Sequence, residues 1–437
     1  MLIVKKFGGS SVADKECIFR VAERCAEDYK NGHDVIVVLS AMGDTTDDLI
    51  AKAKEINLNP SKREMDMLLT TGEQISVSLM AMAFHKLGIP AVSLNAFQVK
   101  MHSTSTYGNA RFKKVESERI LHELGYRKIV IVTGFQGVNK YEDYATMGRG
   151  GSDTTAVAIA AALGADACEI YTDVDGVYTA DPRIVPSARK LKEISYDEMQ
   201  ELASMGANVL HNRSVEMAKK YGVQLVVRSS MNREEGTVVK EVVKVEKLLI
   251  SGVASDKNTA RISVIGIEDK PGTAFKIFNT LAKKNINVDI ILQSVGRDGT
   301  KDISFTVAED DLQDTLAILE ENKEALTIQE INSQESVAKI SIVGAGMMSN
   351  PGVAAKMFEA LTNARVNIHM ISTSEVRITV LINESDVERA INAVHERFGL
   401  ENNKKRKSDW SWRISFFFIT TVFSIVIYLP DSWPGIP

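Results

Sequence analysis

One stretch of sequence in the C-terminal half of the chain occurs twice, and this repeat restricts the folds that this half can adopt. The copies read DKPGTAFKIFNTLAKKNINVDIILQS and SNPGVAAKMFEALTNARVNIHMISTS, and they begin at residues 269 and 349. From Pro271 and Pro351 to Ser294 and Ser374, the matched residues are separated by 80 positions without a gap. Each copy has the pattern of a strand, a Pro-Gly turn, a helix, two strands and a second helix. Two such units predict a pair of small α+β domains that stack on one another, at residues 260–331 and 337–400.

The second copy ends near Gly399 without the last strand that a complete βαββαβ unit requires. Leu248–Val253 is an apolar segment that comes just before the first copy, and it has no obvious partner in the residues that precede it. We therefore expect this segment to replace the missing edge strand.

Upstream of the repeat, over residues 1–245, short apolar runs alternate with helical patterns. The predicted strands are Leu2–Phe7, Val35–Ser40, Ala91–Asn95, Lys128–Phe135, Cys168–Thr172 and Gln224–Arg228. The predicted helices are Asp14–Lys30, Glu64–Leu87, Val115–Leu124, Thr154–Leu163 and Tyr196–Lys220. Strands separated by helices indicate an α/β fold, with a largely parallel sheet covered by helices on both faces.

Composition and charge are ordinary for a globular protein with several domains. The chain has 437 residues, of which 44% are hydrophobic and 25% charged, and at about 150 residues per domain this length suggests roughly three domains. The net charge of −5 argues against a nucleic-acid partner. Cys17, Cys25 and Cys168 cannot all pair, and the N-terminus has no signal-peptide pattern, so we expect reduced thiols and a cytoplasmic protein.

The segment 404–437 differs from the rest of the chain in composition. Residues 408–437 include eight aromatic residues, among them all three tryptophans. A basic cluster at 404–407 precedes Ile414–Leu429, an uncharged run of 16 residues, whereas a membrane-spanning helix needs about 20 apolar residues. A tail anchor and a packed C-terminal element are two interpretations, but an out-of-frame or foreign ending fits the abrupt change best. We do not expect a membrane partner, and we expect this tail to be dispensable for catalysis.

A first glycine-rich loop, with Lys6, Gly8, Gly9 and Ser10, comes directly after the first predicted strand and before a helix. Two glycines let backbone N–H groups approach a phosphate, and a helix N-terminus favours anions. Lys6 would add positive charge beside a phosphoryl group in transfer. Taken alone, the same pattern also fits a plain turn. The chain has no G-x-x-x-x-G-K-[ST] motif, which argues against a P-loop ATPase.

A second glycine-rich loop, Gly148-Arg149-Gly150-Gly151-Ser152-Asp153, also leads into a helix. The guanidinium group of Arg149 suits a substrate carboxylate. Ser152 or Asp153 could simply cap the helix. An acid at the start of this helix also predicts that Asp153 holds Lys6 in place.

An acidic loop, TDVDGVYTADPR at residues 172–183, follows the predicted strand Cys168–Thr172. In open α/β sheets, ligands bind beyond the carboxyl ends of the strands. The aspartates and Tyr178 of this loop suit a nucleotide with Mg²⁺, although a solvated turn can have the same composition.

These motifs together resemble those of the aspartokinases, which have the amino-acid-kinase fold. KFGGSS, the Thr71-Gly72-Glu73 step, GRGGSD and TDVDGVYTADPR occur in this order. The repeat resembles the paired ACT regulatory domains of the same family, and the resemblance covers about residues 1–400. It implies ATP-dependent phosphorylation of the side-chain carboxylate of L-aspartate to 4-phospho-L-aspartate. This reaction is the first step of lysine, threonine and methionine biosynthesis, and it is regulated by feedback.

The resemblance also implies roles for individual residues, with Lys6 and Asp153 as the catalytic pair. The residues implied to bind ATP are Lys6, Gly8, Gly9, Ser10, Thr172, Asp173, Tyr178, Asp181 and Arg183. The residues implied to bind aspartate are Ser40, Thr45, Glu73, Arg149 and Ser152. No metal site of the protein's own is expected, and Mg²⁺ is expected to bridge the oxygens of ATP. The substrate carboxylate is already ionised near neutral pH, so the reaction needs no general base.

The paired copies are expected to form an allosteric site for lysine, threonine or both. The residues expected to contact the effector are Asp269, Gly272, Asn287, Asp289, Gln293, Ser374 and Glu375. If the copies pack side by side as in related kinases, these residues face one shared pocket. Its acids favour lysine, whereas Asn287, Asp289 and Gln293 equally suit threonine. The resemblance also implies a homo-oligomer formed through these domains.

Three other functions remain open from the sequence. The nearest is another ACT-regulated amino-acid kinase, such as one for glutamate. A non-catalytic amino-acid sensor would have a vestigial front domain, but the combination of Lys6, Glu73, Arg149 and Asp153 argues against it. A membrane-tethered protein would rest on Ile414–Leu429 alone.

Overall fold

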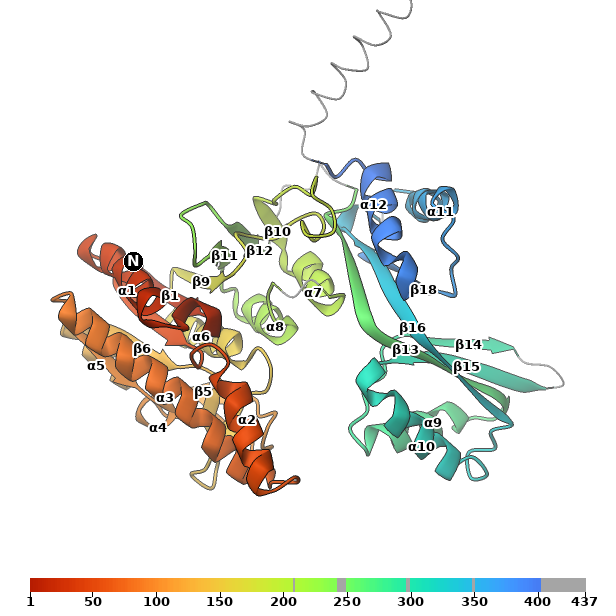
Figure 1. Cartoon of the computed structure of the whole chain (residues 1–437), viewed down its shortest axis with the longest axis horizontal. Helices are drawn as coiled ribbons and strands as arrows, with labels where there is room; N and C mark the ends of the chain where they lie inside the picture. Colours follow the sequence, from red (N-terminus) through yellow and green to blue (C-terminus); the bar gives the residue numbers. More distant parts are fainter. Residues whose placement is uncertain (207–208, 242–248, 296–298, 348–349, 402–437) are drawn as a thin grey trace, which may run out of the picture.

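A computed structural model of the protein describes residues 1–206, 209–241, 249–295, 299–347 and 350–401. The described residues form an N-terminal α/β region and a second region that contains the two repeat copies (Figure 1). The tail 404–437 and Leu248 lie outside the described residues.

The N-terminal region is built on an 8-stranded sheet with the order β10-β12-β11-β9-β1-β2-β6-β3. The strands are β1 (Leu2–Phe7), β2 (Asp34–Leu39), β3 (Ala91–Leu94), β6 (Ile129–Thr133), β9 (Ala167–Thr172), β10 (Glu193–Ser195), β11 (Leu225–Ser229) and β12 (Thr237–Lys240). All neighbours pair in parallel except β11 and β12. The six predicted strands are therefore confirmed, with ends that coincide or differ by at most two residues.

Helices cover both faces of this sheet, as the buried runs of β1, β2 and β6 require. The helices of the N-terminal region are α1 (Lys15–Lys30), α2 (Thr45–Ile56), α3 (Lys62–Lys86), α4 (Ala96–Val99), α5 (Glu118–Gly125), α6 (Gly151–Leu163), α7 (Tyr196–Ser204) and α8 (Asn212–Tyr221). On one face α1 and α3 pack on the side chains of Phe7, Val37 and Ile131. On the other, α5, α6, α7 and α8 pack on those of Val4 and Val38.

One long predicted helix is wrong, and several short elements were not predicted. Tyr196–Lys220 forms two helices, α7 and α8, because Gly206 has a φ of 97° and His211 caps a new helix at Arg213 N. A small 4-stranded sheet was also missed. It contains β4 (Met101–Ser103), β5 (Phe112–Val115), β7 (Gln136–Val138) and β8 (Tyr144–Thr146).

The repeat forms one 6-stranded antiparallel sheet with the order β14-β15-β13-β16-β18-β17. The first copy contributes α9 (Thr273–Ala282), β14 (Ile291–Val295), β15 (Thr300–Val307) and α10 (Leu312–Glu321). The second contributes α11 (Val353–Asn363), β17 (Met370–Thr373), β18 (Arg377–Asn383) and α12 (Val387–Arg397). The long strands β13 (Gly252–Glu268) and β16 (Glu330–Val343) cross both copies.

The start of β13 supplies the strand that the second copy lacks. Residues Gly252–Asp256 pair antiparallel with Lys339–Val343 of β16, whereas Arg261–Ile265 pair with Glu330–Gln334 in the first copy. The replacement predicted from the sequence is thus confirmed, although the paired residues begin at Gly252. The first copy is inserted between this strand and the rest of the second copy.

The three cysteines are free, and Cys25 and Cys168 are buried. Among the described residues, α3 is long and apolar enough to cross a membrane, and half of its apolar window is buried. It packs against α1, β3 and β6 as a core helix.

Gly344→Ala is expected to lower the free energy of unfolding by about 1–3 kcal/mol, because overpacking forces the backbone to move. A Cβ at this position would lie 2.4 Å from Ile250 Cα and 2.7 Å from Leu249 O, in the residues just before β13. Chemical denaturation measures the change. Gly125→Ala is the control, because a Cβ there meets nothing within 4 Å. Equal stability of Gly344→Ala and wild type would contradict this packing.

Candidate active site

The loops that follow β1, β2 and β6 meet at one edge of the large sheet. Ser40 N donates to Phe7 O (3.2 Å), Gly43 N to Gly9 O (3.1 Å) and Gly134 N to Leu39 O (2.9 Å). This edge is the carboxyl end of the parallel strands, where α/β sheets bind ligands.

Lys6 and Asp153 form an ion pair at this edge. Lys6 lies near the end of β1 and Asp153 in the first turn of α6, and Lys6 Nζ is 2.7 Å from Asp153 Oδ1. Their side chains are 13% and 11% exposed, so the pair is shielded but reachable. The prediction that Asp153 holds Lys6 agrees with this contact.

The first glycine loop packs tightly against the loop after β2. A Cβ on Gly9 would lie 2.8 Å from Ala41 O and 3.0 Å from Gly43 O, so only glycine fits there. The loop continues into a short 3₁₀ turn, Gly9–Val12, and α1 begins only at Lys15 with Asp14 as its cap. The helix predicted after this loop, Asp14–Lys30, is therefore confirmed, and a 3₁₀ turn separates the loop from it. Gly8 lies beside Lys6, and Ser10 is exposed.

Glu73 of α3 is a buried acid that faces the same loops. Its Oε1 accepts a hydrogen bond from Ala41 N (3.1 Å), whereas Oε2 has no partner among the described residues. Burial raises the pKa of Glu73 to about 7, because a carboxylate without a counter-charge is costly in the interior. Thr45 starts α2 next to this step, and its Cγ2 would lie 3.5 Å from a Cβ on Gly72.

The second glycine loop presents Arg149 to solvent. Gly148 and Gly150, on either side of it, have φ values of 75° and 67°, which glycine adopts without strain. Arg149 is exposed and forms no ion pair with the described residues. Ser152 lies inward, since a Cβ on Gly134 would be 2.5 Å from Ser152 Oγ. The cap of α6 is Gly150, and neither Ser152 nor Asp153 has this role.

Four of the residues implied for the nucleotide line one cavity of about 490 Å³, here called the loop cavity. They are Asp173, Tyr178, Asp181 and Arg183. Thr172 is not among the lining residues, but its hydroxyl donates to Asp173 Oδ1 (2.9 Å). The hydrogen bond from Arg183 lowers the pKa of Asp181, so this wall of the cavity carries an ionised acid.

Sequence reasoning missed residues that complete these sites. The second repeat copy lines the loop cavity through Val253, Ala254, Ser255 and Ile391. Nothing local in the sequence indicates this contact, which depends on tertiary packing. Thr133 has a buried hydroxyl without a partner in the described part of the chain. Its position at the end of a buried strand, just before Gly134, was a usable signal.

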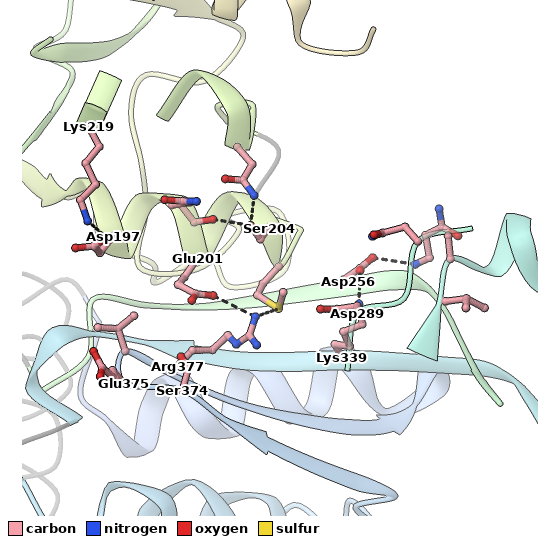
Figure 2. Close-up of a pocket in the computed structure, with 18 residues that line it drawn as sticks. Asp197, Glu201, Ser204, Lys219, Asp256, Asp289, Lys339, Ser374, Glu375 and Arg377 are labelled. Atoms are coloured by element: carbon pink, nitrogen blue, oxygen red, sulfur yellow. Dashed lines mark hydrogen bonds and ion pairs between the residues drawn. The ribbon is translucent and has the colours of Figure 1, made fainter. Parts of the chain in front are cut away.

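A larger cavity of about 940 Å³ lies between α7 and the repeat sheet, and we call it the α7 cavity (Figure 2). Four of the predicted effector residues line it: Asn287, Asp289, Ser374 and Glu375. Lys339, buried at its floor, pairs with Asp289 (2.5 Å) and Asp256 (3.2 Å). Arg377 joins the two regions by pairing with Glu201 of α7 at 3.1 Å.

The other predicted effector residues, Asp269, Gly272 and Gln293, do not line the α7 cavity. Asp269 follows the far end of β13 and pairs with Lys301 (2.7 Å), and Gly272 caps α9. Gln293 is exposed on the edge strand β14. The expectation of one shared pocket is therefore wrong within a single chain, because β13 and β16 join the copies into one continuous sheet.

No group of three or more histidine, cysteine, aspartate or glutamate residues in the described part of the chain could hold a metal ion. Two of the acids at the site instead pair with a single cation each, in the Lys6–Asp153 and Arg183–Asp181 pairs.

Comparison with known proteins gives consistent matches. The model of the amino acid kinase family matches residues 1–229, and that of the ACT domain matches residues 262–322 and 340–398. An aspartokinase of Bacillus sp. (strain MGA3) is 52% identical over 403 residues, which cover 92% of this chain and 98% of that relative.

Solved structures of E. coli aspartokinase III are similar over 91% of this chain and 99% of theirs, at 25% identity. The complex with aspartate and ADP (R-state) has a TM-score of 0.77. The complex with lysine and aspartate (T-state) has a TM-score of 0.71.

Proposed function

The chain belongs to the amino acid kinase family and is an aspartate kinase with ACT domains, and on this premise we propose which of its residues perform the reaction. The observation that carries the proposal is the Lys6–Asp153 ion pair at the carboxyl edge of the sheet, beside two glycine loops. The substrates proposed are ATP and L-aspartate, as in the E. coli complex with aspartate and ADP.

Transfer of the γ-phosphoryl group joins one aspartate side-chain oxygen to phosphorus and breaks the bond to the oxygen of ADP. The attacking carboxylate is ionised at neutral pH, so no residue has to remove a proton. The main barrier is the approach of several anions, and fixed cations and amides lower it. Lys6 supplies the charge, while Gly8, Gly9 and Ser10 supply amides. Mg²⁺ enters with ATP as part of the substrate.

Aspartate is held by groups on the other side of the same edge. Glu73 receives its ammonium group at the free Oε2, and Arg149 receives its α-carboxylate. Ser40 after β2, Thr45 at the start of α2 and Ser152 in the first turn of α6 orient it. The adenine nucleotide occupies the loop cavity, with Asp173, Tyr178, Asp181 and Arg183 on its wall and Thr172 behind Asp173.

Incubation of the protein with MgATP, aspartate and hydroxylamine tests the reaction, because hydroxylamine traps an acyl phosphate as a hydroxamate. A hydroxamate that forms with glutamate and not with aspartate would indicate a different amino-acid kinase. No product with either would indicate a non-catalytic sensor.

We also propose a cytoplasmic location, since the three cysteines are free thiols. A homo-oligomer through the ACT region is supported by both sheet edges. Ile291 and Leu292 on β14, and Ile371 on β17, are exposed apolar residues on edge strands. Such edges favour pairing with another chain.

Lys6→Ala is expected to lower kcat by about 10³-fold or more, because a cation at the transferring phosphoryl group is lost. Asp153→Asn should have a smaller effect on kcat, since Lys6 remains but is no longer anchored. The hydroxamate assay under saturating substrates measures both. Lys15→Ala, on the exposed start of α1, is the control. Near-normal turnover of Lys6→Ala would show that the phosphoryl group lies elsewhere.

The value of kcat/KM for aspartate is expected to rise with pH through about 7. Below this pH, Glu73 is protonated and cannot pair with an ammonium group. Above it, the carboxylate is ionised, and the ammonium group of the substrate supplies the counter-charge that this buried carboxylate lacks. Glu73→Gln should lower kcat/KM and abolish the step near pH 7. Glu64→Gln, an exposed ion-pair residue on the same helix, should retain it. An unchanged profile in Glu73→Gln would remove Glu73 from the substrate site.

Lysine, threonine or both at millimolar concentration are expected to slow the wild-type enzyme by about 5- to 150-fold, the usual range of allosteric coupling. Lysine as an effector is supported by the solved complex of E. coli aspartokinase III with lysine and aspartate. Ser374→Phe, at a residue that lines the α7 cavity, should relieve inhibition with uninhibited turnover close to normal. Asp314→Ala on the exposed face of α10 should stay inhibited. A wild-type rate that neither amino acid changes, alone or together, would refute the regulatory assignment.

A further inference from the structure

The loop that carries the nucleotide residues packs into the core of the second ACT copy. Ala180, Val185 and Ala188 belong to the same hydrophobic cluster as Ile340, Val380 and Ile391 of that copy. Val253 lies in the first part of β13, which completes the second copy, and its N–H donates to Thr179 O (2.8 Å). The wall of the loop cavity is therefore shared by two domains.

Thr179 is the point at which this contact is made. Its side chain is fully buried between Tyr178 and Asp181 of the cavity wall. Its Oγ1 lies 2.9 Å from His395 Nε2 of α12, 3.2 Å from Leu400 O and 2.9 Å from Arg189 N. Two of these groups belong to the C-terminal end of the second copy.

The hydrogen-bond roles follow from the chemistry of the groups. Arg189 N can only donate and Leu400 O can only accept, so the Thr179 hydroxyl accepts from the first and donates to the second. His395 then donates from Nε2, so that each of the three groups around Thr179 Oγ1 has the hydroxyl as its partner. Burial lowers the pKa of His395 to about 4, so the ring is neutral at physiological pH and its one ring proton is on Nε2. His395 is 1% exposed.

We propose that His395 is a positioning residue for the nucleotide: through Thr179 it holds the 172–183 loop in the shape that binds ATP, so that the second ACT copy sets nucleotide affinity. This inference rests on the proposed nucleotide site in the loop cavity. The neutral His395–Thr179 hydrogen bond does not touch the reacting atoms. It therefore affects KM for ATP rather than the chemical step.

His395→Phe tests the proposal, because it keeps an aromatic ring but removes the donor. KM for ATP, and the Kd of ADP measured by calorimetry, are expected to rise about 3- to 10-fold, the loss of one neutral hydrogen bond. The values of kcat and of KM for aspartate should stay within about twofold of wild type. The single variants His395→Gln and Thr179→Ser keep a hydrogen-bonding group. They should therefore retain most of the affinity for ATP and ADP.

His369→Phe is the matched control. His369 lies in the same ACT copy and bonds Asn383 Oδ1 (2.8 Å), away from the residues that line the loop cavity. It should leave KM for ATP unchanged. A His395→Phe variant with unchanged KM for ATP would overturn the proposal. So would a variant whose kcat and both KM values change together, which would mark a general loss of structure.

Asp181→Asn separates this inference from the nucleotide site on which it rests. If Asp181→Asn leaves KM for ATP unchanged, the nucleotide does not use the loop cavity, and both ideas fail. If Asp181→Asn raises KM for ATP and His395→Phe does not, the site is correct and only the positioning role of His395 is refuted.

Discussion

The organisation of this protein depends on two strands that are too long for one domain. β13 and β16 each cross both ACT copies, and their antiparallel pairing fixes one continuous sheet. Because the first part of β13 completes the second copy, the chain that leaves the kinase region is at once part of the regulatory sheet. The 172–183 loop then packs on this edge. Gly206 also packs against this edge, and only glycine fits there, because a Cβ on Gly206 would lie 2.0 Å from Ser255 O.

The kinase site balances stability against ligand binding. Glu73 is buried with one carboxylate oxygen unpartnered in the described part of the chain, an arrangement that costs folding energy. Lys6 has a partner in Asp153, but the pair is reachable from the edge of the sheet. Such partly satisfied charges are typical of sites whose remaining partner is the substrate.

Much of this architecture could be predicted from local sequence. The buried strands next to Lys6 and Asp173 have strong apolar runs, and the 80-residue offset fixed the repeat. The elements and residues that were not predicted were missed for physical reasons. The strands β4, β7 and β8 are three residues long, too short for a recognisable alternation. The break between α7 and α8 depends on the backbone at Gly206. The roles of Glu73 and Ser152 came from family resemblance, and Thr179 and His395 depend on tertiary contacts that no local pattern encodes.

The bond between Thr179 and Leu400 O spans 221 positions of sequence, and this separation has a consequence for folding. Contacts between distant residues require large loops to close first, and chains rich in them fold slowly. The loop cavity reaches its final shape only after the start of β13 and the second ACT copy, to the end of α12, have assembled. Folding of the front half alone therefore leaves the cavity without its second wall.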